Sequence, residues 1–219
     1  MATSLLWLAL IDMITVIANL KGGSGKSTVS FNLLTWLLAR GYETKAFDLD
    51  PQRTLSDVAA VREEEGIIPA INISAVEMPD FEHAGHVEVI IDVGAANPDG
   101  MHEAIRHAQR VIVPVPPSQP DVWATQRFLK IISDARIGVD GALEILAFVN
   151  RADTHHAVRE SDDAEFALQQ LPGITVLPQR LYQRTLYRRS MSEGMSVSEL
   201  SPGSKGANEF EAWAKALYQ

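Results

Sequence analysis

The sequence predicts an α/β protein in which a mostly parallel, twisted sheet is covered by helices on both faces. Short apolar runs rich in β-branched residues alternate with longer helical patterns along the 219-residue chain. A glycine-rich turn joins the first of these runs to the first helical pattern. Polar residues directly follow several predicted strands, which is where open α/β sheets bind their ligands. Together these observations favour a parallel sheet with a ligand site at one edge.

The hydrophobic content, the net charge and the absence of cysteine limit the classes of protein to which this chain can belong. With 46% hydrophobic residues the chain can bury one sizeable core, so a single domain is its simplest organisation. The formal net charge of -9 argues against a protein that coats nucleic acid with its whole surface, although a local basic patch is compatible with it. Cysteine is absent, which excludes disulfides, thiolate metal sites, iron–sulfur clusters and cysteine nucleophiles.

The apolar run over residues 5–11 does not predict a membrane segment. It follows no lysine or arginine, is closed by Asp12 and is too short to span a bilayer. We expect residues 1–12 to be an extension, either disordered or an edge strand, that precedes one domain over residues 13–219.

The predicted elements alternate regularly. The first strand, residues 14–20, leads into the glycine-rich turn, and the helix after the turn should end near Arg40 and Gly41, a typical C-terminal signal. The later strands are expected at residues 44–50, 68–76, 87–92, 111–115, 143–150 and 174–177. The later helices are expected at residues 58–65, 101–108, 122–133, 157–171, 182–190 and 208–218.

Prolines mark several of these boundaries. Pro51 ends the strand over 44–50, and Pro69 interrupts the run over 68–76. A cluster of four further prolines predicts a stiff loop before the helix over 122–133. They are Pro114, Pro116, Pro117 and Pro120.

The segment over 21–28, Lys-Gly-Gly-Ser-Gly-Lys-Ser-Thr, has the features of a phosphate-binding loop. Its glycines let the backbone bend and bring bare N–H groups towards an anion. The N-terminus of the next helix adds partial positive charge. The residues expected to bind the nucleotide here are Gly22, Gly23, Ser24, Gly25, Lys26, Ser27 and Thr28.

Lys26 and Ser27 are expected to carry the chemistry of this loop. The Lys26 ammonium should reach the β- and γ-phosphates, and the Ser27 hydroxyl should coordinate Mg²⁺. The loop departs from the ordinary pattern, because Leu20 stands where a glycine is usual and a second lysine, Lys21, follows it. A plain turn is the alternative, but glycines, lysine and hydroxyl between a strand and a helix favour nucleotide binding.

Three carboxylates stand at the ends of predicted strands. Asp48 and Asp50 lie two residues apart and should point to one side of the sheet, and Asp92 ends another strand. Phosphoryl transfer to water needs a group that orients the water and carboxylates that hold Mg²⁺. We assign Asp50 to the water, Asp50 and Asp92 with Ser27 to the metal, and Asp48 to a supporting catalytic role. Solvated strand-end carboxylates are the alternative.

These motifs resemble the deviant Walker A ATPases of the ParA/MinD type, which are P-loop nucleoside triphosphatases. Besides the loop, the resemblance includes Asp-Leu-Asp-Pro-Gln at 48–52 and Val-Ile-Ile-Asp at 89–92. Matches at 113–118, 148–151 and 195–199 favour the small plasmid-partition ParA proteins such as ParF. The resemblance covers almost the whole chain from Met13 onward.

The resemblance implies that ATP and Mg²⁺ bind between two subunits of a homodimer. Lys21, the family's signature lysine, would cross to the partner's phosphates and act with Lys26, Asp48 and Asp50 in catalysis. Hydrolysis would be slow until a ParB-like centromere-binding adaptor stimulates it. The resemblance also implies that Asn150, next to Arg151, lies close to the adenine, so both are expected at the cofactor site.

Two departures from the family pattern stand out. The family commonly has Thr-Pro-Pro after the sheet aspartate, whereas this chain has Val93, Gly94 and Ala95. Longer members also carry an N-terminal DNA-reading domain, which residues 1–12 are too few to form. Site-specific operator binding is therefore not expected.

A local basic stretch predicts sequence-independent binding of double-stranded DNA. Arg180, Arg184 and Arg188 recur every four residues, which would place them on one stripe of a helix, with Arg189 beside it. Lys205 resembles a basic position that ParA proteins use for the same purpose. A solvated helix face, or ion pairing within the chain, is the alternative.

We therefore predict a ParA-type partition ATPase that acts in the bacterial cytoplasm on the nucleoid and segregates or positions plasmid or chromosomal DNA. A MinD-like membrane-associated or protein-cluster positioning ATPase is the alternative, although the last helix carries two glutamates and only Lys215 as a cation, which argues against membrane binding. An ATP-dependent ligase on the same scaffold is a third possibility. The histidines His83, His86, His155 and His156 offer no recognisable metal-binding spacing.

Overall fold

The computed structural model describes residues 13–74, 87–155 and 159–218. The predicted extension over 1–12, part of the run over 68–76, and three of the histidines lie outside these ranges. The expectations placed on those residues stay predictions, as does the division of the chain into an extension and one domain.

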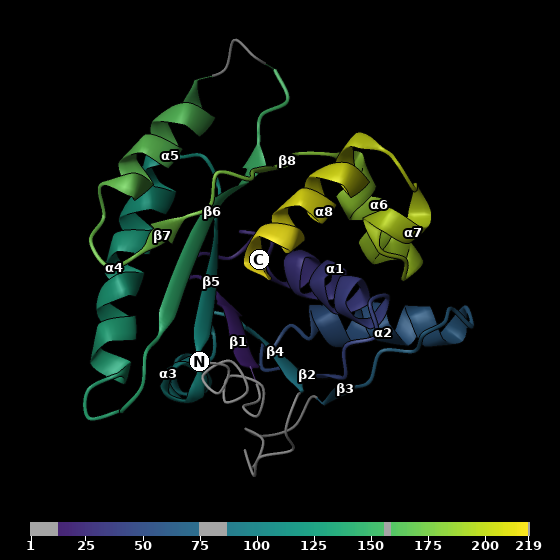
Figure 1. Ribbon diagram of the computed structural model, residues 1–219, viewed down its shortest axis with the longest axis horizontal. Coiled ribbons are helices and arrows are strands. Elements are labelled where there is room, and N and C mark those ends of the chain that lie inside the picture. Colours follow the sequence, from purple (N-terminus) through teal and green to yellow (C-terminus); the bar gives the residue numbers. More distant parts are fainter. Residues whose placement is uncertain (1–12, 75–86, 156–158, 219) are drawn as a thin grey trace, which may run out of the picture.

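Strands and helices largely alternate from β1 to β7, and three successive helices, α6 to α8, end the described chain (Figure 1). The strands are β1 (Met13–Ala18), β2 (Thr44–Asp48), β3 (Ile73–Ser74), β4 (Glu88–Val93), β5 (Arg110–Val115), β6 (Glu144–Ala152), β7 (Thr175–Val176) and β8 (Leu181–Tyr182). The helices are α1 (Lys26–Leu38), α2 (Thr54–Glu64), α3 (Pro98–His107), α4 (Gln119–Ala135), α5 (Glu160–Gln169), α6 (Thr185–Glu193), α7 (Val197–Leu200) and α8 (Lys205–Leu217).

The strands of the described chain pair in parallel, in the order β3-β2-β4-β1-β5-β6-β7, and β8 pairs with β6 beside this path. The first strand, β1, lies in the middle, between β4 and β5. The next strand in the chain, β2, lies beyond β4, whereas β5 and β6 extend the sheet on the other side. The segment that follows β1 therefore emerges at the point where the strand order reverses, the usual ligand site of such sheets.

Helices cover both faces of the sheet, as predicted (Figure 1). Helices α3, α4 and α5 pack on one face, and α1, α2 and α6 to α8 on the other. Neighbouring β1 residues Val16 and Ile17 are both 0% exposed, yet each belongs to a different core. Burial on both faces explains why the strands are continuous apolar runs rather than alternating ones.

Four helices begin three or four residues earlier than their apolar patterns predict, because upstream side chains accept N–H groups of their first turns. Helix α3 begins at Pro98, where the Asn97 side chain accepts the N–H of Gly100, and α8 begins at Lys205, where the Ser204 side chain accepts the N–H of Ala207. Helix α4 begins at Gln119, where the Ser118 side chain accepts the N–H of Asp121, and Pro120 occupies the first turn. Helix α2 begins at Thr54, and the Asp48 carboxylate accepts the N–H of Ser56 at 2.8 Å. A cap thus extends each helix N-terminal to its first buried apolar residue.

The predicted helix over 182–190 is wrong at its start. Leu181 and Tyr182 form β8, and α6 begins at Thr185 after Arg184, whose backbone is extended. The short helix α7 was not predicted, although Ser196 and Glu199 form a reciprocal capping box whose Ser-x-x-Glu spacing is visible in the sequence.

Arg62 joins α2 to the segment that links α6 and α7. Its guanidinium is fully buried and donates to both carboxylate oxygens of Glu199, at 2.9 and 2.7 Å, and to the Gly194 carbonyl at 2.9 Å. Burial alone would raise the pKa of Glu199, but hydrogen bonds from Arg62 and Ser196 lower it. Removal of one member of a buried ion pair generally costs about 3–5 kcal/mol, so this contact fixes α2 against α6.

Candidate functional site

A cavity of about 590 Å³ opens where β1 ends. The glycine-rich loop forms one wall, and α6 with β8 forms another. Most of the residues predicted to bind nucleotide lie in its lining. The lining consists of residues 22–23, 25–29, 95–96, 150–151 and 181–184, with Asp50, Gln52, Thr54, Tyr187, Arg188 and Met191.

The glycine-rich loop presents free backbone donors. Gly25 has a φ of 92°, a left-handed conformation that favours glycine, and no side chain caps α1. Among the described residues, the first helix amide that finds a backbone acceptor is that of Val29, which donates to Gly25 at 3.0 Å. The preceding N–H groups at the helix N-terminus are therefore available to an anion.

Lys26 and Ser24 are buried without strong partners. Lys26 is 6% exposed, and its ammonium lies 3.5 Å from the Lys21 carbonyl oxygen, a long contact. The Ser24 hydroxyl has no hydrogen-bond partner within the described residues. A buried ammonium is stable when an anion accompanies it, and a phosphate group in the cavity would satisfy Lys26. Ser24, although predicted to bind the nucleotide, is not part of the cavity lining.

Asp92 has the features of a cation ligand. It is fully buried, and neither carboxylate oxygen has a hydrogen-bond partner within the described part of the chain. Burial raises the pKa of Asp92 to about 7, opposed by the nearby Ser27 hydroxyl and then reinforced by Asp48. A divalent cation would compensate the buried charge. The donor set of Asp92 and Ser27, with Asp50 in the cavity lining, consists of the oxygen ligands that Mg²⁺ prefers.

Asp50 lies in the lining against Gly94. Its carboxylate accepts the N–H of Gln52 at 3.0 Å, and a Cβ added at Gly94 would lie 2.0 Å from Asp50 Oδ2. A side chain at position 94 would therefore displace Asp50. This contact gives a physical reason for the glycine that follows Val93 in place of the residue common in the family.

Asp48 makes structural hydrogen bonds, and the supporting catalytic role expected for it stays a prediction. Its carboxylate accepts the N–H and the hydroxyl of Ser56, at 2.8 and 2.9 Å, and the N–H of Asp50 at 3.2 Å. The side chain is 2% exposed and does not contribute to the cavity lining. Asp48 therefore holds the start of α2 and the backbone of Asp50, so any support that it gives to the reaction acts through Asp50.

Asn150 and Arg151 lie at the cavity, as expected, but contact the loop backbone. The Asn150 side-chain amide donates to the Ser24 carbonyl at 2.7 Å. The Arg151 guanidinium donates to the Gly23 carbonyl at 2.5 Å and to Gln183 Oε1 at 2.9 Å. Both side chains therefore hold the phosphate loop.

Lys21 lies beside the cavity without lining it. Its backbone N–H donates to Asn19 Oδ1 at 3.0 Å, and the Asn19 amide donates to the Pro114 carbonyl at 2.8 Å. Asn19 was not predicted as a site residue, although an asparagine that directly follows an apolar strand is visible in the sequence. Its side chain is fully buried, and buried amides are generally hydrogen-bonded. It fixes the start of the loop to the end of β5.

A family model described as the CobQ/CobB/MinD/ParA nucleotide binding domain matches residues 15–197. The chain belongs to this family. The resemblance to ParA/MinD-type ATPases stated from the motifs is therefore confirmed.

Two relatives agree with this assignment, and a solved structure shares the fold. The maintenance of carboxysome distribution protein A of Halothiobacillus neapolitanus is 27% identical over 201 residues, which cover 87% of this chain and 89% of the relative. Protein ParA of Rhizobium radiobacter is 25% identical over 222 residues, covering 94% and 96%. A cobyrinic acid a,c-diamide synthase from Mycobacterium smegmatis, solved with a bound ATP analogue and magnesium, has a TM-score of 0.74 at 19% identity and covers 95% and 94%.

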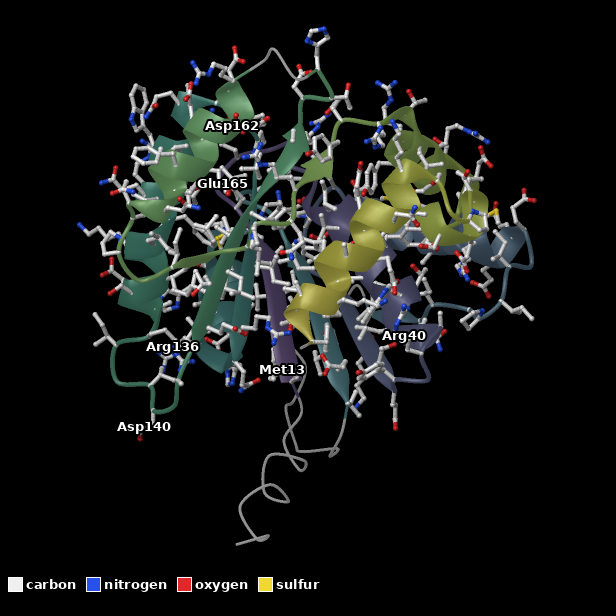
Figure 2. All side chains as sticks on the ribbon, turned by 45° about the horizontal axis from the view of Figure 1, so that its top comes forward. Met13, Arg40, Arg136, Asp140, Asp162 and Glu165 are labelled. Atoms are coloured by element: carbon white, nitrogen blue, oxygen red, sulfur yellow. The ribbon has the colours of Figure 1, made fainter. Side chains whose placement is uncertain are left out.

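The predicted arginine stripe is not present in this ParA/MinD-family chain. Arg180 precedes β8 and pairs with Asp162 and Glu165, at 2.7 and 2.6 Å. Both of these acidic residues lie on α5 (Figure 2). Arg184 precedes α6 and pairs with Glu209 of α8. Arg180 therefore does not share a helix with Arg184 and Arg188, because β8 lies between Arg180 and α6. Arg180 and Arg184 are also held by carboxylates of other helices.

The remaining cations differ in position. Arg184 and Arg188 line the cavity, so a role in DNA binding could not be separated from a role at the nucleotide site. Arg189 is 57% exposed and contacts Glu193 within α6. Lys205 is exposed at the start of α8, next to Gly206, where an added Cβ would touch Leu186 of α6. Arg189 and Lys205 therefore lie outside the lining, on helices that pack together.

Proposed function

We propose that this chain is a ParA-type ATPase that partitions or positions a cargo through ATP-dependent dimerisation. The two lysines of the glycine-rich loop carry this proposal. Lys26 faces the cavity of its own chain, whereas Lys21 lies next to that cavity and outside its described lining. An ammonium in this position is suited to an anion held by a second subunit, in the manner of an arginine finger.

Each subunit would bind ATP with Mg²⁺ in the 590 Å³ cavity. The free N–H groups before Val29, together with Lys26, would hold the phosphates, and Ser27, Asp92 and Asp50 would provide oxygen ligands for Mg²⁺. Asp50 would also orient the attacking water. Hydrolysis is proposed to be slow until a ParB-like adaptor protein stimulates it.

The dimer would bind double-stranded DNA without sequence preference. Of the predicted contacts, Arg180, Arg189 and Lys205 lie outside the cavity lining. Arg180 is held by two carboxylates, whereas Arg189 and Lys205 are solvent-exposed. Two subunits would double their number, which favours phosphate binding. Association with the bacterial nucleoid would follow from this contact.

The cargo could be DNA or a protein assembly. ParA of Rhizobium radiobacter supports partition, whereas the carboxysome distribution relative supports the positioning of a protein cluster. Both cargoes are compatible with the same ATP-dependent cycle of dimerisation and release.

Membrane attachment through the last helix is not proposed. Phe210 and Trp213 of α8 are 1% and 0% exposed and belong to the hydrophobic core between this helix and the sheet. Within the described residues, every helix is too short or too polar to cross a bilayer. A helix whose apolar face is already buried has little left to insert into lipid.

Replacement of Lys21 by alanine tests the proposed dimer. We expect the variant to bind ATP and Mg²⁺ within about threefold of the parent but to dimerise at least about tenfold more weakly, because one charged hydrogen bond contributes about 1.5–3 kcal/mol. Sedimentation velocity with a non-hydrolysable ATP analogue measures both species. Lys45→Ala, an exposed lysine on β2, is the control. An undiminished dimer in Lys21→Ala would refute the proposed crossing.

The double variant Arg189→Ala with Lys205→Ala tests DNA binding. The ATP-bound protein should bind duplex DNA about tenfold more weakly, and the salt slope should fall by about one for each phosphate that the variant no longer neutralises. ATP hydrolysis without DNA should be unchanged. Arg127→Ala with Lys130→Ala on the exposed face of α4 removes the same charge and serves as the control. Equal weakening in both double variants would mean that net charge, rather than a local contact, governs DNA binding.

A further inference from the structure

The strand β6 contains an irregularity at the residue that contacts the phosphate loop. Asn150 pairs with Leu181 and Ala152 with Tyr182, so the register shifts at Arg151, which lies between them. Arg151 has a φ of 59°, a left-handed conformation that is uncommon for a residue with a side chain. Bulges of this kind redirect a side chain, and they are enriched beside functional sites.

The redirected Arg151 side chain bridges two walls of the cavity. Nη1 donates to the Gly23 carbonyl at 2.5 Å, and Nε donates to Gln183 Oε1 at 2.9 Å. Gln183 is itself fixed, because its backbone N–H donates to the Ala152 carbonyl at 2.8 Å. The guanidinium therefore connects the glycine-rich loop to the segment between β8 and α6.

Asn150 holds the neighbouring peptide group of the loop. Its amide donates to the Ser24 carbonyl at 2.7 Å, and a Cβ at Gly25 would approach its nitrogen to 2.4 Å. Side chains from consecutive positions thus bind the carbonyls of Gly23 and Ser24 in turn. Only glycine at position 25 leaves room for this contact.

These two contacts determine where the loop's donors point. In a planar trans peptide group the carbonyl and the N–H point in opposite directions. With the carbonyls of Gly23 and Ser24 held, the N–H groups of Ser24 and Gly25 are turned to the opposite side, and neither finds an acceptor among the described residues. Successive free N–H groups of this kind form an anion-binding concavity.

We propose that Arg151 is a positioning residue for phosphate binding, which it serves by orienting the Gly23–Ser24 peptide group rather than by contacting the base. This inference rests on the proposed function. It predicts that Arg151 affects the affinity for nucleotides that carry a β-phosphate and leaves recognition of the nucleoside unchanged.

The variant Arg151→Gly removes the guanidinium and retains a residue suited to the left-handed bulge. Calorimetry on the full chain should show ADP binding weakened about tenfold, the loss expected for one charge-assisted hydrogen bond, with AMP binding unchanged. Arg151→Lys should show the same pattern, because lysine lacks both the Nε donor that contacts Gln183 and the planar fork that fixes the direction of the bond to Gly23. Arg127→Gln, an exposed arginine of α4, is the control for loss of charge.

A second measurement needs no nucleotide. In ¹⁵N relaxation of the nucleotide-free chain, the order parameters of Ser24 and Gly25 should fall in Arg151→Gly and stay unchanged in the control. Equal weakening of ADP and AMP, or full recovery of ADP affinity in Arg151→Lys, would overturn the positioning role. So would unchanged affinities with unchanged order parameters. If the parent chain binds neither ADP nor ATP, the proposed function fails as well, which separates that result from failure of Arg151 alone.

Discussion

Replacement of Lys26 by alanine is expected to weaken ATP binding by about 1000-fold. Truncation of one member of a buried, hydrogen-bonded charge pair costs about 2–5 kcal/mol, and a 1000-fold loss corresponds to about 4 kcal/mol. Lys26 is 6% exposed, and its ammonium makes one long contact, with the Lys21 carbonyl, among the described residues, so its charge is available to phosphate. Titration calorimetry with ATP and Mg²⁺ measures the loss.

The fold should survive this change. Lys26 is the first residue of α1, and alanine is a good helix former, so the melting temperature of the nucleotide-free protein should change little. Lys45→Ala is the matched control for an exposed lysine and should bind ATP like the parent. ATP affinity within about threefold of the parent in Lys26→Ala would place the phosphates elsewhere.

Replacement of Asp50 by alanine is expected to slow ATP hydrolysis by about 10²–10⁴-fold, the usual contribution of a positioned proton acceptor. ATP binding and dimerisation should persist, because Lys26, Lys21, the loop amides and the other proposed Mg²⁺ ligands, Ser27 and Asp92, are unchanged. The variant should therefore accumulate as an ATP-bound dimer. Phosphate release in a single turnover measures the rate, and sedimentation velocity measures the dimer.

Two comparisons separate chemistry from loop structure in this experiment. Asp50→Asn retains an acceptor for the Gln52 N–H and the shape that packs on Gly94, so it should be as slow as Asp50→Ala if the carboxylate charge matters. Asp57→Ala removes an exposed carboxylate from the first turn of α2 and should hydrolyse ATP normally. A parental rate in Asp50→Asn would exclude Asp50 as the residue that activates water.

The sheet and the phosphate loop could be predicted from sequence because their signals are local. Both faces of the sheet are buried, so neighbouring strand residues such as Val16 and Ile17 are both apolar. The continuous apolar runs that result are easily recognised in the sequence. The loop over 21–28 combines glycines, a lysine and a hydroxyl within one turn. Asp92 could be proposed as a metal ligand because a carboxylate directly follows the apolar run over residues 89–91.

The basic stretch could not be predicted correctly, because long-range pairs determine its structure. The four-residue spacing of the arginines is helical, yet β8 forms at Leu181 and Tyr182 by pairing with β6, distant in sequence. Partners that hold Arg180 and Arg184 come from α5 and α8. Tertiary pairing outweighed local periodicity here, and it likewise gave Asp48 a capping role that its strand-end position does not reveal.

The central position of β1 has a consequence for synthesis of the chain. The register joins Met13 to Glu88 and Thr15 to Arg110, so both neighbours of β1 are translated well after it. At about 5–20 residues per second, the delay is on the order of ten seconds. During that interval the glycine-rich loop leaves the ribosome without the strands that flank it, and the cavity beside it is complete only after β8 and α6, which form its other wall, have been made.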